Sequence, residues 1–203
     1  MPKKRKGFRV EKDSLGEVYV PNSALYGAQT QRAIDNFPIS GIKMDFPFTN
    51  SFIDSLGIIK DAAARANKSL GLISSKKANA ISKAAKEVWQ SKHNDQFPID
   101  VFQTGSGTSS NMNANEVIAN LASKFSKTQV DPNDDVNMSQ SSNDVIPTAI
   151  KLSAHMDLTK KLLPALDMLI EVTEKKGNSL KGLVKTGRTH LMDAMPLDFH
   201  QEL

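Results

Sequence analysis

Apolar side chains recur every three or four residues along much of the chain, which is the spacing of one face of a helix. The first such series is Ile53, Leu56, Ile59 and Ala63. Thr49 or Asn50 lies where the N-cap of this helix is expected. The second series is Ala78, Ile81, Ala85, Val88 and Trp89. We expect this second helix to begin at a Ser74 or Ser75 cap and to end before Asn94 and Pro98.

Two further series predict helices in the second half of the chain. One is Val117, Ile118, Leu121 and Phe125, which predicts a helix over about 113–125 with Asn111 or Asn113 as its cap. The longest series is Ile150, Leu158, Leu162, Leu166, Leu169 and Ile170. It predicts a helix that starts at Pro147, bends at Pro164 and stops at Gly177. Because such a helix approaches about 40 Å, we expect it to pack in a bundle or against other subunits.

The two ends of the chain follow other patterns. Residues 8–48 are interrupted by glycines and prolines, and their β-favouring cluster Val18-Tyr19-Val20 predicts a small hairpin among loops. Near Pro196 a new helical pattern begins and reaches Leu203 without a terminating Gly, Asn or Pro. We therefore expect the chain to be a truncated part of a longer protein.

The net positive charge is concentrated at the N-terminus. The sequence has 26 basic and 22 acidic residues and a pI near 9.2. Four of the basic residues are Lys3, Lys4, Arg5 and Lys6, so the rest of the chain is formally neutral. Nucleic-acid-binding proteins spread Lys and Arg over a face. We therefore expect no nucleic-acid partner, and a nucleic-acid module that depends on this tail is the weakest of the alternatives.

Cysteine is absent, which excludes disulfides, thiolate metal sites, iron–sulfur clusters and cysteine nucleophiles. No apolar run approaches the roughly 20 residues needed to cross a bilayer. The basic N-terminus has no apolar segment behind it, as a secretory signal would. We expect a soluble, cytoplasmic protein with no membrane partner.

Two segments rich in small polar residues are each followed by a predicted helix. They are residues 104–113 (TGSGTSSNMN) and 137–144 (NMSQSSND). Hydroxyls, amides and free N–H groups at a helix start favour a carboxylate or phosphate. A P-loop is excluded because no Gly-Lys-Ser/Thr follows the glycines. Each segment alone is also compatible with an ordinary polar cap.

A third polar segment, residues 185–193 (KTGRTHLMD), places His190 beside a threonine in a stretch that we expect to be non-helical. An imidazole there can act as a general acid or base, since its ordinary pKa of about 6.5 lies near working pH. The other histidines are His93, His155 and His200, which lie in helical patterns without a second ligand at metal spacing. We expect no metal.

Together and in this order, the three segments resemble the fumarase/aspartase superfamily, and within it the class II fumarate hydratases. Residues 11–16 (EKDSLG) and 26–32 (YGAQTQR), with Val20-Pro21 between them, are similar to the opening of the same family. The resemblance extends from Phe8 to Leu203. The tetrapeptide of residues 187–190 (GRTH) favours a fumarase, because aspartases can carry glutamine at its last position; residues 106–108 (SGT) are fumarase-like as well.

The resemblance implies a mainly α fold. Residues 1–140 would form the N-terminal domain with its small β-hairpin, and residues 141–203 would begin the central helical-bundle domain with its first long helix. It also implies reversible hydration of fumarate to L-malate in the tricarboxylic acid cycle, without a cofactor. Family members are homotetramers whose active sites draw residues from three subunits, and their partner is a small dicarboxylate.

By resemblance, His190 handles the proton of the water or hydroxyl at C2 of the substrate. The residues implied to hold the substrate carboxylates are Ser106, Gly107, Thr108, Ser141, Ser142, Asn143 and Thr189. Removing a proton beside a carboxylate builds an aci-carboxylate dianion. Fixed hydrogen-bond donors placed where that charge develops lower the barrier.

The chain departs from the family pattern in two places. Many members have His-Pro-Asn-Asp at a second dicarboxylate site, whereas this chain has Asp131-Pro132-Asn133-Asp134, with Thr128 where an arginine is often found. The added carboxylate would repel a dicarboxylate, so we expect weak or no binding there. The family's catalytic serine loop, Gly-Ser-Ser-x-Met-Pro-x-Lys-x-Asn, has no counterpart in this sequence, so we expect the chain alone to be inactive.

Two other functions stay open from the sequence. One is aspartate ammonia-lyase or another lyase of the superfamily, and the other is a non-catalytic helical scaffold. A scaffold has no need for an acid–base group beside polar loops, so the effect of replacing His190 separates it from an enzyme.

Overall fold

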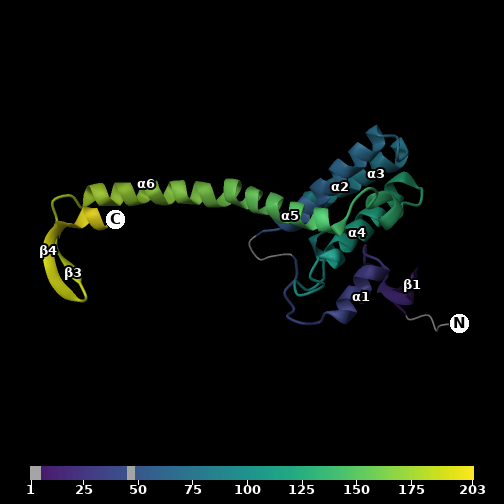
Figure 1. Ribbon diagram of the computed structural model, residues 1–203, viewed down its shortest axis with the longest axis horizontal. Coiled ribbons are helices and arrows are strands. Elements are labelled where there is room, and N and C mark those ends of the chain that lie inside the picture. The colour runs from purple at the N-terminus through teal and green to yellow at the C-terminus, as the bar shows by residue number, and fades with distance from the viewer. Residues whose placement is uncertain (1–5, 45–48) are drawn as a thin grey trace. The chain divides into compact units, whose positions relative to one another are not determined.

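The computed structural model describes residues 6–44 and 49–203. The basic residues Lys3, Lys4 and Arg5 and residues 45–48, at the end of the predicted loop region, lie outside this part. The chain divides into two compact units, Met1–His155 and Met156–Leu203, and each is described by itself (Figure 1). The domain boundary expected near residue 140 stays a prediction.

The first unit begins with the predicted hairpin. Strands β1 (Phe8–Asp13) and β2 (Gly16–Pro21) pair antiparallel over their whole length. Helix α1 (Ala28–Asn36) follows, where the sequence predicted only loops. It has no apolar series of its own, and its N-terminus is satisfied by Glu116 from a distant helix. That tertiary contact could not be anticipated from the local sequence.

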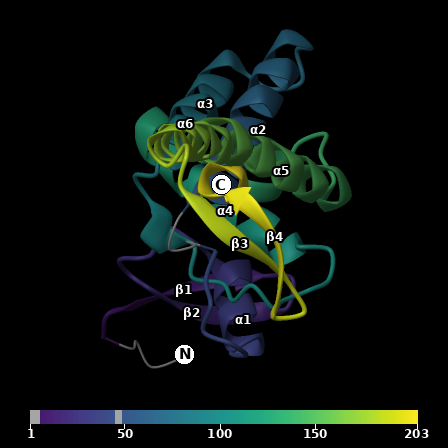
Figure 2. The ribbon, with the colours of Figure 1, turned by 90° about the vertical axis from the view of Figure 1, so that its left-hand side faces the viewer.

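Helices α2 (Ser51–Ser69) and α3 (Ser75–Trp89) confirm the two predicted apolar series and lie side by side in both views (Figures 1 and 2). The Ser74 side chain accepts from Lys77 N, as a cap should. Gly57 allows the close approach, because a Cβ there would lie 2.8 Å from the carbonyl oxygen of Ala85. The core between them includes Ile53, Leu56, Ile81 and Val88, each at most 1% exposed.

Helix α4 (Thr108–Ser126) begins about five residues earlier than the sequence predicted. Gly107 precedes it in the left-handed region (φ 68°), and the backbone N–H of Ser110 donates to Gln103 Oε1 at 3.0 Å. Asn111 and Asn113 are therefore not caps but buried residues within the helix. The predicted apolar face is confirmed, since Val117 and Ile118 are fully buried in the core.

Short irregular helices join these elements. A 3₁₀ turn, η1 (Asn94–Gln96), lies before α4, and a π-helical turn, η2 (Pro132–Val136), lies after it. Helix α5 (Ser142–Asp157) then begins five residues before the predicted start at Pro147. The backbone carbonyl of Ser141 accepts from the N–H groups of Asp144 and Val145, so the first turn closes ahead of the proline.

The second unit opens with a π-helical turn, η3 (Leu158–Leu162), and helix α6 (Leu163–Ser179). The irregularity predicted at Pro164 thus falls one turn earlier, where the missing N–H of the proline removes a hydrogen bond. The predicted helix over 196–203 is wrong. Strands β3 (Val184–Thr189) and β4 (Met192–Asp198) form a hairpin, and only η4 (Phe199–Glu202) is helical. Pro196 pairs opposite Thr186 in this hairpin, so the segment is a strand although its own apolar spacing is helical.

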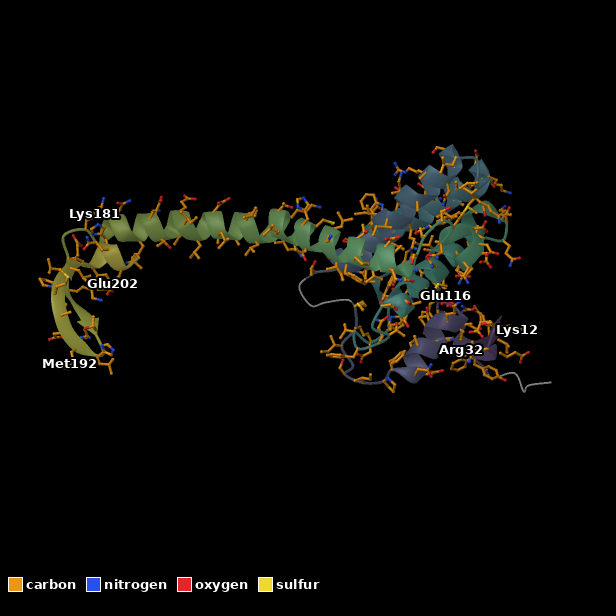
Figure 3. The ribbon with its side chains drawn as sticks, viewed as in Figure 1. Lys12, Arg32, Glu116, Lys181, Met192 and Glu202 are labelled. Atoms are coloured by element: carbon orange, nitrogen blue, oxygen red, sulfur yellow. The ribbon has the colours of Figure 1, made fainter. Side chains whose placement is uncertain are left out.

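Figure 3 shows the side chains of both units, with Met192 at the tip of the hairpin and Lys181 and Glu202 at its other end. In the described residues, no helix is both long and apolar enough to span a membrane.

Candidate functional site

The first polar loop, before α4, carries two exposed hydroxyls. Ser106 Oγ and Thr108 Oγ1 lie 2.8 Å apart and share a hydrogen bond. Gly107 between them has a left-handed backbone, and a Cβ there would meet the Ile146 side chain of α5 at 3.0 Å. The glycine therefore allows both the turn and the close approach of α5.

The second polar loop, before α5, lies directly beside the first. Asn111 Nδ2, one turn into α4, donates to Ser142 Oγ at 3.1 Å. The Asn143 N–H donates to Ser141 Oγ at 3.2 Å. Ser141 and Asn143 are exposed and Ser142 is half-buried. The structure thus brings two of the three sequence segments together, at neighbouring helix N-termini whose free donors favour an anion.

A buried polar network behind these loops was not predicted from the sequence. Lys60 of α2 is fully buried, and its Nζ donates to Asn137 Oδ1 at 3.0 Å and to Gln140 Oε1 at 2.9 Å. Burial lowers the pKa of the Lys60 ammonium to about 7. Asn111 and Asn115 of α4 also donate to Asn137 Oδ1, at 3.1 and 3.2 Å. A lysine within an apolar helical series was the signal that sequence reasoning passed over.

The third segment belongs to the second unit, and its Thr189 and His190 are exposed. Thr189 pairs with Met192, so His190 and Leu191 form a two-residue hairpin turn. Both turn residues have positive φ, 46° and 63°, as a two-residue turn with two left-handed positions requires. Asn and Gly usually occupy these positions, so histidine and leucine store strain there. The expectation that His190 is non-helical is confirmed.

The remaining histidines do not form a ligand cluster. His93 pairs with Glu87 at 2.9 Å, and His155 lies in α5 and His200 in η4. Among residues 6–44 and 49–203, no three His, Cys, Asp or Glu side chains are grouped as metal ligands.

The local structure of residues 131–134 is consistent with the weak dicarboxylate binding that we expect there. Asp131 caps the π-helical turn η2, and its Oδ1 accepts from the N–H groups of Asn133 and Asp134 at 2.7 and 2.9 Å. Asp135 lies beside it and accepts from Lys77 Nζ at 2.6 Å. The chain's own carboxylates therefore occupy the donors that an external anion would need.

Curated proteins are similar in sequence to most of the chain. A class II fumarate hydratase of Xylella fastidiosa is 55% identical over 195 residues, which cover 96% of this chain and 40% of that protein. One from Halobacterium salinarum is 54% identical, with 96% of this chain and 42% of that protein covered. The chain thus spans about 40% of the length of the curated relatives that it matches.

Solved structures give the same result. A class II fumarase of Schistosoma mansoni matches with a TM-score of 0.89 and 44% identity, over 96% of this chain and 42% of that one. A fumarate lyase:delta crystallin of Brucella melitensis matches with a TM-score of 0.90 and 42% identity, over 96% and 46%. This agreement shows the expected fumarase/aspartase fold. The Lyase_1 family model, described as lyase, matches residues 16–203, and the chain belongs to this lyase family.

Proposed function

We propose that the chain supplies part of the active site of a class II fumarate hydratase, which hydrates fumarate reversibly to L-malate. The observation that carries this proposal is the hydrogen bond from Asn111 to Ser142, which joins two polar helix N-termini in one unit. The similarity to proteins named class II fumarate hydratase supports it. The tricarboxylic acid cycle and the cytoplasm are the expected setting.

The polar loops of the first unit would hold the substrate carboxylates. Hydroxyl and backbone donors at helix starts favour a carboxylate without bringing in a formal positive charge. The substrate-binding residues proposed in these loops are Ser106, Gly107, Thr108, Ser141, Ser142 and Asn143. Thr189, in the second unit, is proposed to bind substrate as well. As the proton leaves C3 of malate, negative charge grows on the adjacent carboxylate, and donors fixed in advance bind that state more tightly than the ground state.

His190 would exchange the proton of the water or hydroxyl at C2. The left-handed turn holds its imidazole at the exposed tip of a hairpin, ahead of both strands. The proton at C3 needs a base on the opposite face, since the addition is anti. We propose that this base comes from the family's serine loop, which lies outside this sequence.

The assembled enzyme would be a homotetramer. Only Gly177 of α6 is buried, whereas large apolar residues of that helix are between 42% and 65% exposed. They are Leu163, Leu166, Met168, Leu169, Ile170 and Val172. A continuous apolar helix surface of this kind is suited to packing in a bundle of helices from several subunits.

We propose weak or no dicarboxylate binding at residues 131–134. A calorimetric titration of the assembled enzyme with malate should give one site per subunit. Two sites per subunit would contradict this part of the proposal.

The activity is tested by malate formation from fumarate, followed by absorbance. The 203-residue chain is assayed alone and after the remainder of the protein is supplied as a separate piece. We expect activity only in the mixture. Activity of the chain alone would contradict the placement of the C3 base. Ammonia release from aspartate without malate formation would identify an aspartase instead. No activity in any of these assays would favour a non-catalytic scaffold.

A further inference from the structure

Three groups donate to one amide oxygen in the buried network. Asn137 Oδ1 accepts from Lys60 Nζ, Asn111 Nδ2 and Asn115 Nδ2, all within 3.0–3.2 Å. Each of the two asparagines of α4 has its Oδ1 buried and without a hydrogen-bond partner among the described residues. The asparagines thus turn their donors toward Asn137 even though this leaves their own acceptors unused.

Lys60 explains that arrangement. Its Nζ donates to Asn137 and to Gln140, and the charged and the neutral amine both have the two hydrogens that these bonds need. Lys60 therefore fixes the oxygen of Asn137 on the side that faces the network. The oxygen of Asn137 in turn requires Asn111 to present its NH₂ group. That NH₂ has two hydrogens, and the second is directed to Ser142 Oγ at 3.1 Å. Ser142 is thereby made an acceptor in this contact, and its only hydroxyl proton is left for another partner.

Lys60 also holds the backbone that leads to Ser142. Its second bond, to Gln140 Oε1, leaves Gln140 Nε2 to donate to the carbonyls of Val136 and Met138 at 2.9 and 3.1 Å. Asn67 of α2 donates to the same Met138 carbonyl at 3.0 Å. Between these contacts Ser139 is in the left-handed region at φ 61°. A non-glycine residue in that conformation costs about 1 kcal/mol and persists only where its surroundings fix it.

We propose that Lys60 is a positioning residue which, through Asn137 and Asn111, orients the Ser142 hydroxyl to donate to the substrate carboxylate. This inference rests on the proposed function. Lys60 itself is fully buried and acts only through the network. Without the two N–H donors of Lys60, the Asn137 and Asn111 amides can turn over, and the Ser142 proton is then drawn into a bond with Asn111 Oδ1.

The test compares Lys60→Met with Lys68→Met in the active assembly. Lys68 lies on the same helix two turns later, exposed, and donates to Asn79 Oδ1. We expect Lys60→Met to raise KM for malate about 10-fold or more and to lower kcat as well, because the Ser142 donor is lost in the ground state and more strongly in the transition state, where charge grows on the carboxylate. A merely structural lysine would lower the amount of folded enzyme and leave KM unchanged. Unchanged KM in Lys60→Met overturns the proposal.

Two further variants test the hydrogen-bond directions in the network. Asn137→Asp keeps an acceptor for all three donors but loses the bond from Asn137 Nδ2 to the Gln140 carbonyl at 3.3 Å, so KM should rise less than in Lys60→Met. Asn111→Asp keeps the size of the side chain but can only accept, so Ser142 must donate to it and KM should rise. This second variant decides the matter if Lys60→Met fails to fold, and an unchanged KM there overturns the proposal.

A readout without catalysis separates this inference from the activity. In the ¹⁵N-labelled chain, the side-chain NH₂ protons of Asn111 should be protected from exchange by their two acceptors. Lys60→Met should remove that protection, whereas Lys68→Met should keep it. Protection that survives Lys60→Met overturns the network argument even if malate is formed. Loss of protection together with no malate formation by the parent assembly leaves the positioning role intact and overturns only the proposed activity.

Discussion

The two units present their candidate residues in contrasting ways. In the first unit, Ser142 lies against α4, and Asn111, Asn137 and a buried lysine stand behind it. In the second unit, His190 is exposed at the tip of a hairpin, and no hydrogen bond within the described chain orients its ring. The donors that we propose for a carboxylate are thus fixed by the unit that carries them. The acid–base group that we propose at His190 would acquire its surroundings from other parts of the proposed assembly.

The two units also differ in how much apolar surface they bury. The first buries a continuous apolar cluster drawn from α2, α3, α4 and α5. The second buries little beyond Gly177, while Leu169 and Ile170 of α6 are more than half exposed. A unit with its own core can hold its side chains in the directions that hydrogen bonds need, because close packing allows few other rotamers. A unit without one depends on its partners for that order.

The largest effect is expected in the second unit, on replacing His190 with Asn. Turnover of the assembled enzyme should fall by about 100- to 10,000-fold, the usual cost of losing a general acid or base. The stability of the chain should not fall, since the side chain is exposed and asparagine suits the left-handed turn position at least as well as histidine. Steady-state kinetics and thermal melts of the same samples measure both. His155→Asn is the matched control, and turnover that survives the loss of His190 refutes its role.

The next effect concerns the buried lysine of the first unit. The folded-state pKa of Lys60, about 7, lies below the ordinary value of 10.5. Between these two values the unfolded chain binds more protons, so the free energy of unfolding should rise with pH, by up to about 1.4 kcal/mol per pH unit. Urea denaturation between pH 7 and 9 should show this rise in the parent chain and in Lys68→Met. Its persistence in Lys60→Met would assign it to another group.

A smaller loss is expected from Glu116→Gln. The Glu116 carboxylate accepts from the N–H groups of Gly27, Gln29 and Thr30 and from Thr30 Oγ1, at 2.6–3.1 Å, and thus holds the start of α1 (Figure 3). The amide turns an NH₂ toward these donors, so the free energy of unfolding should fall by about 2–3 kcal/mol. Urea denaturation measures it, with the exposed Glu17→Gln as control. Equal stability of the two variants would show that α1 needs no such cap.

The smallest effect is expected at the edge of the first unit, where Arg32 pairs with Asp13 at 2.7 Å. The hydrogen bond from Arg32 lowers the pKa of the Asp13 carboxyl. The pair therefore stabilises the fold above the ordinary pKa of aspartate and loses this contribution as pH falls through the lowered value. Asp13→Asn should cost about 0.5–1 kcal/mol at pH 7. Thermal melts should show the difference disappearing in strong acid, while Asp35→Asn changes little at either pH.

The sequence by itself determined the core helices and the three polar segments. The apolar series of α2, α3 and α4 predict the faces that are buried, because helical spacing alone places those residues together. The three polar segments and the N-terminal opening, in the right order, pointed to the lyase family whose model matches the chain. The hairpin of β1 and β2 followed from a β-favouring cluster between turn residues.

Tertiary structure alone decided the features that depend on distant partners. Helix α1 has its N-terminus held by Glu116, which is more than 80 residues away in sequence. The segment around Pro196 is a strand because Thr186 pairs with it, although its own pattern is helical. The role of Lys60 is visible only where α2, α4 and the loop before α5 meet. Local propensity is worth a few tenths of a kcal/mol per residue, and one buried charge or one strand pairing outweighs it.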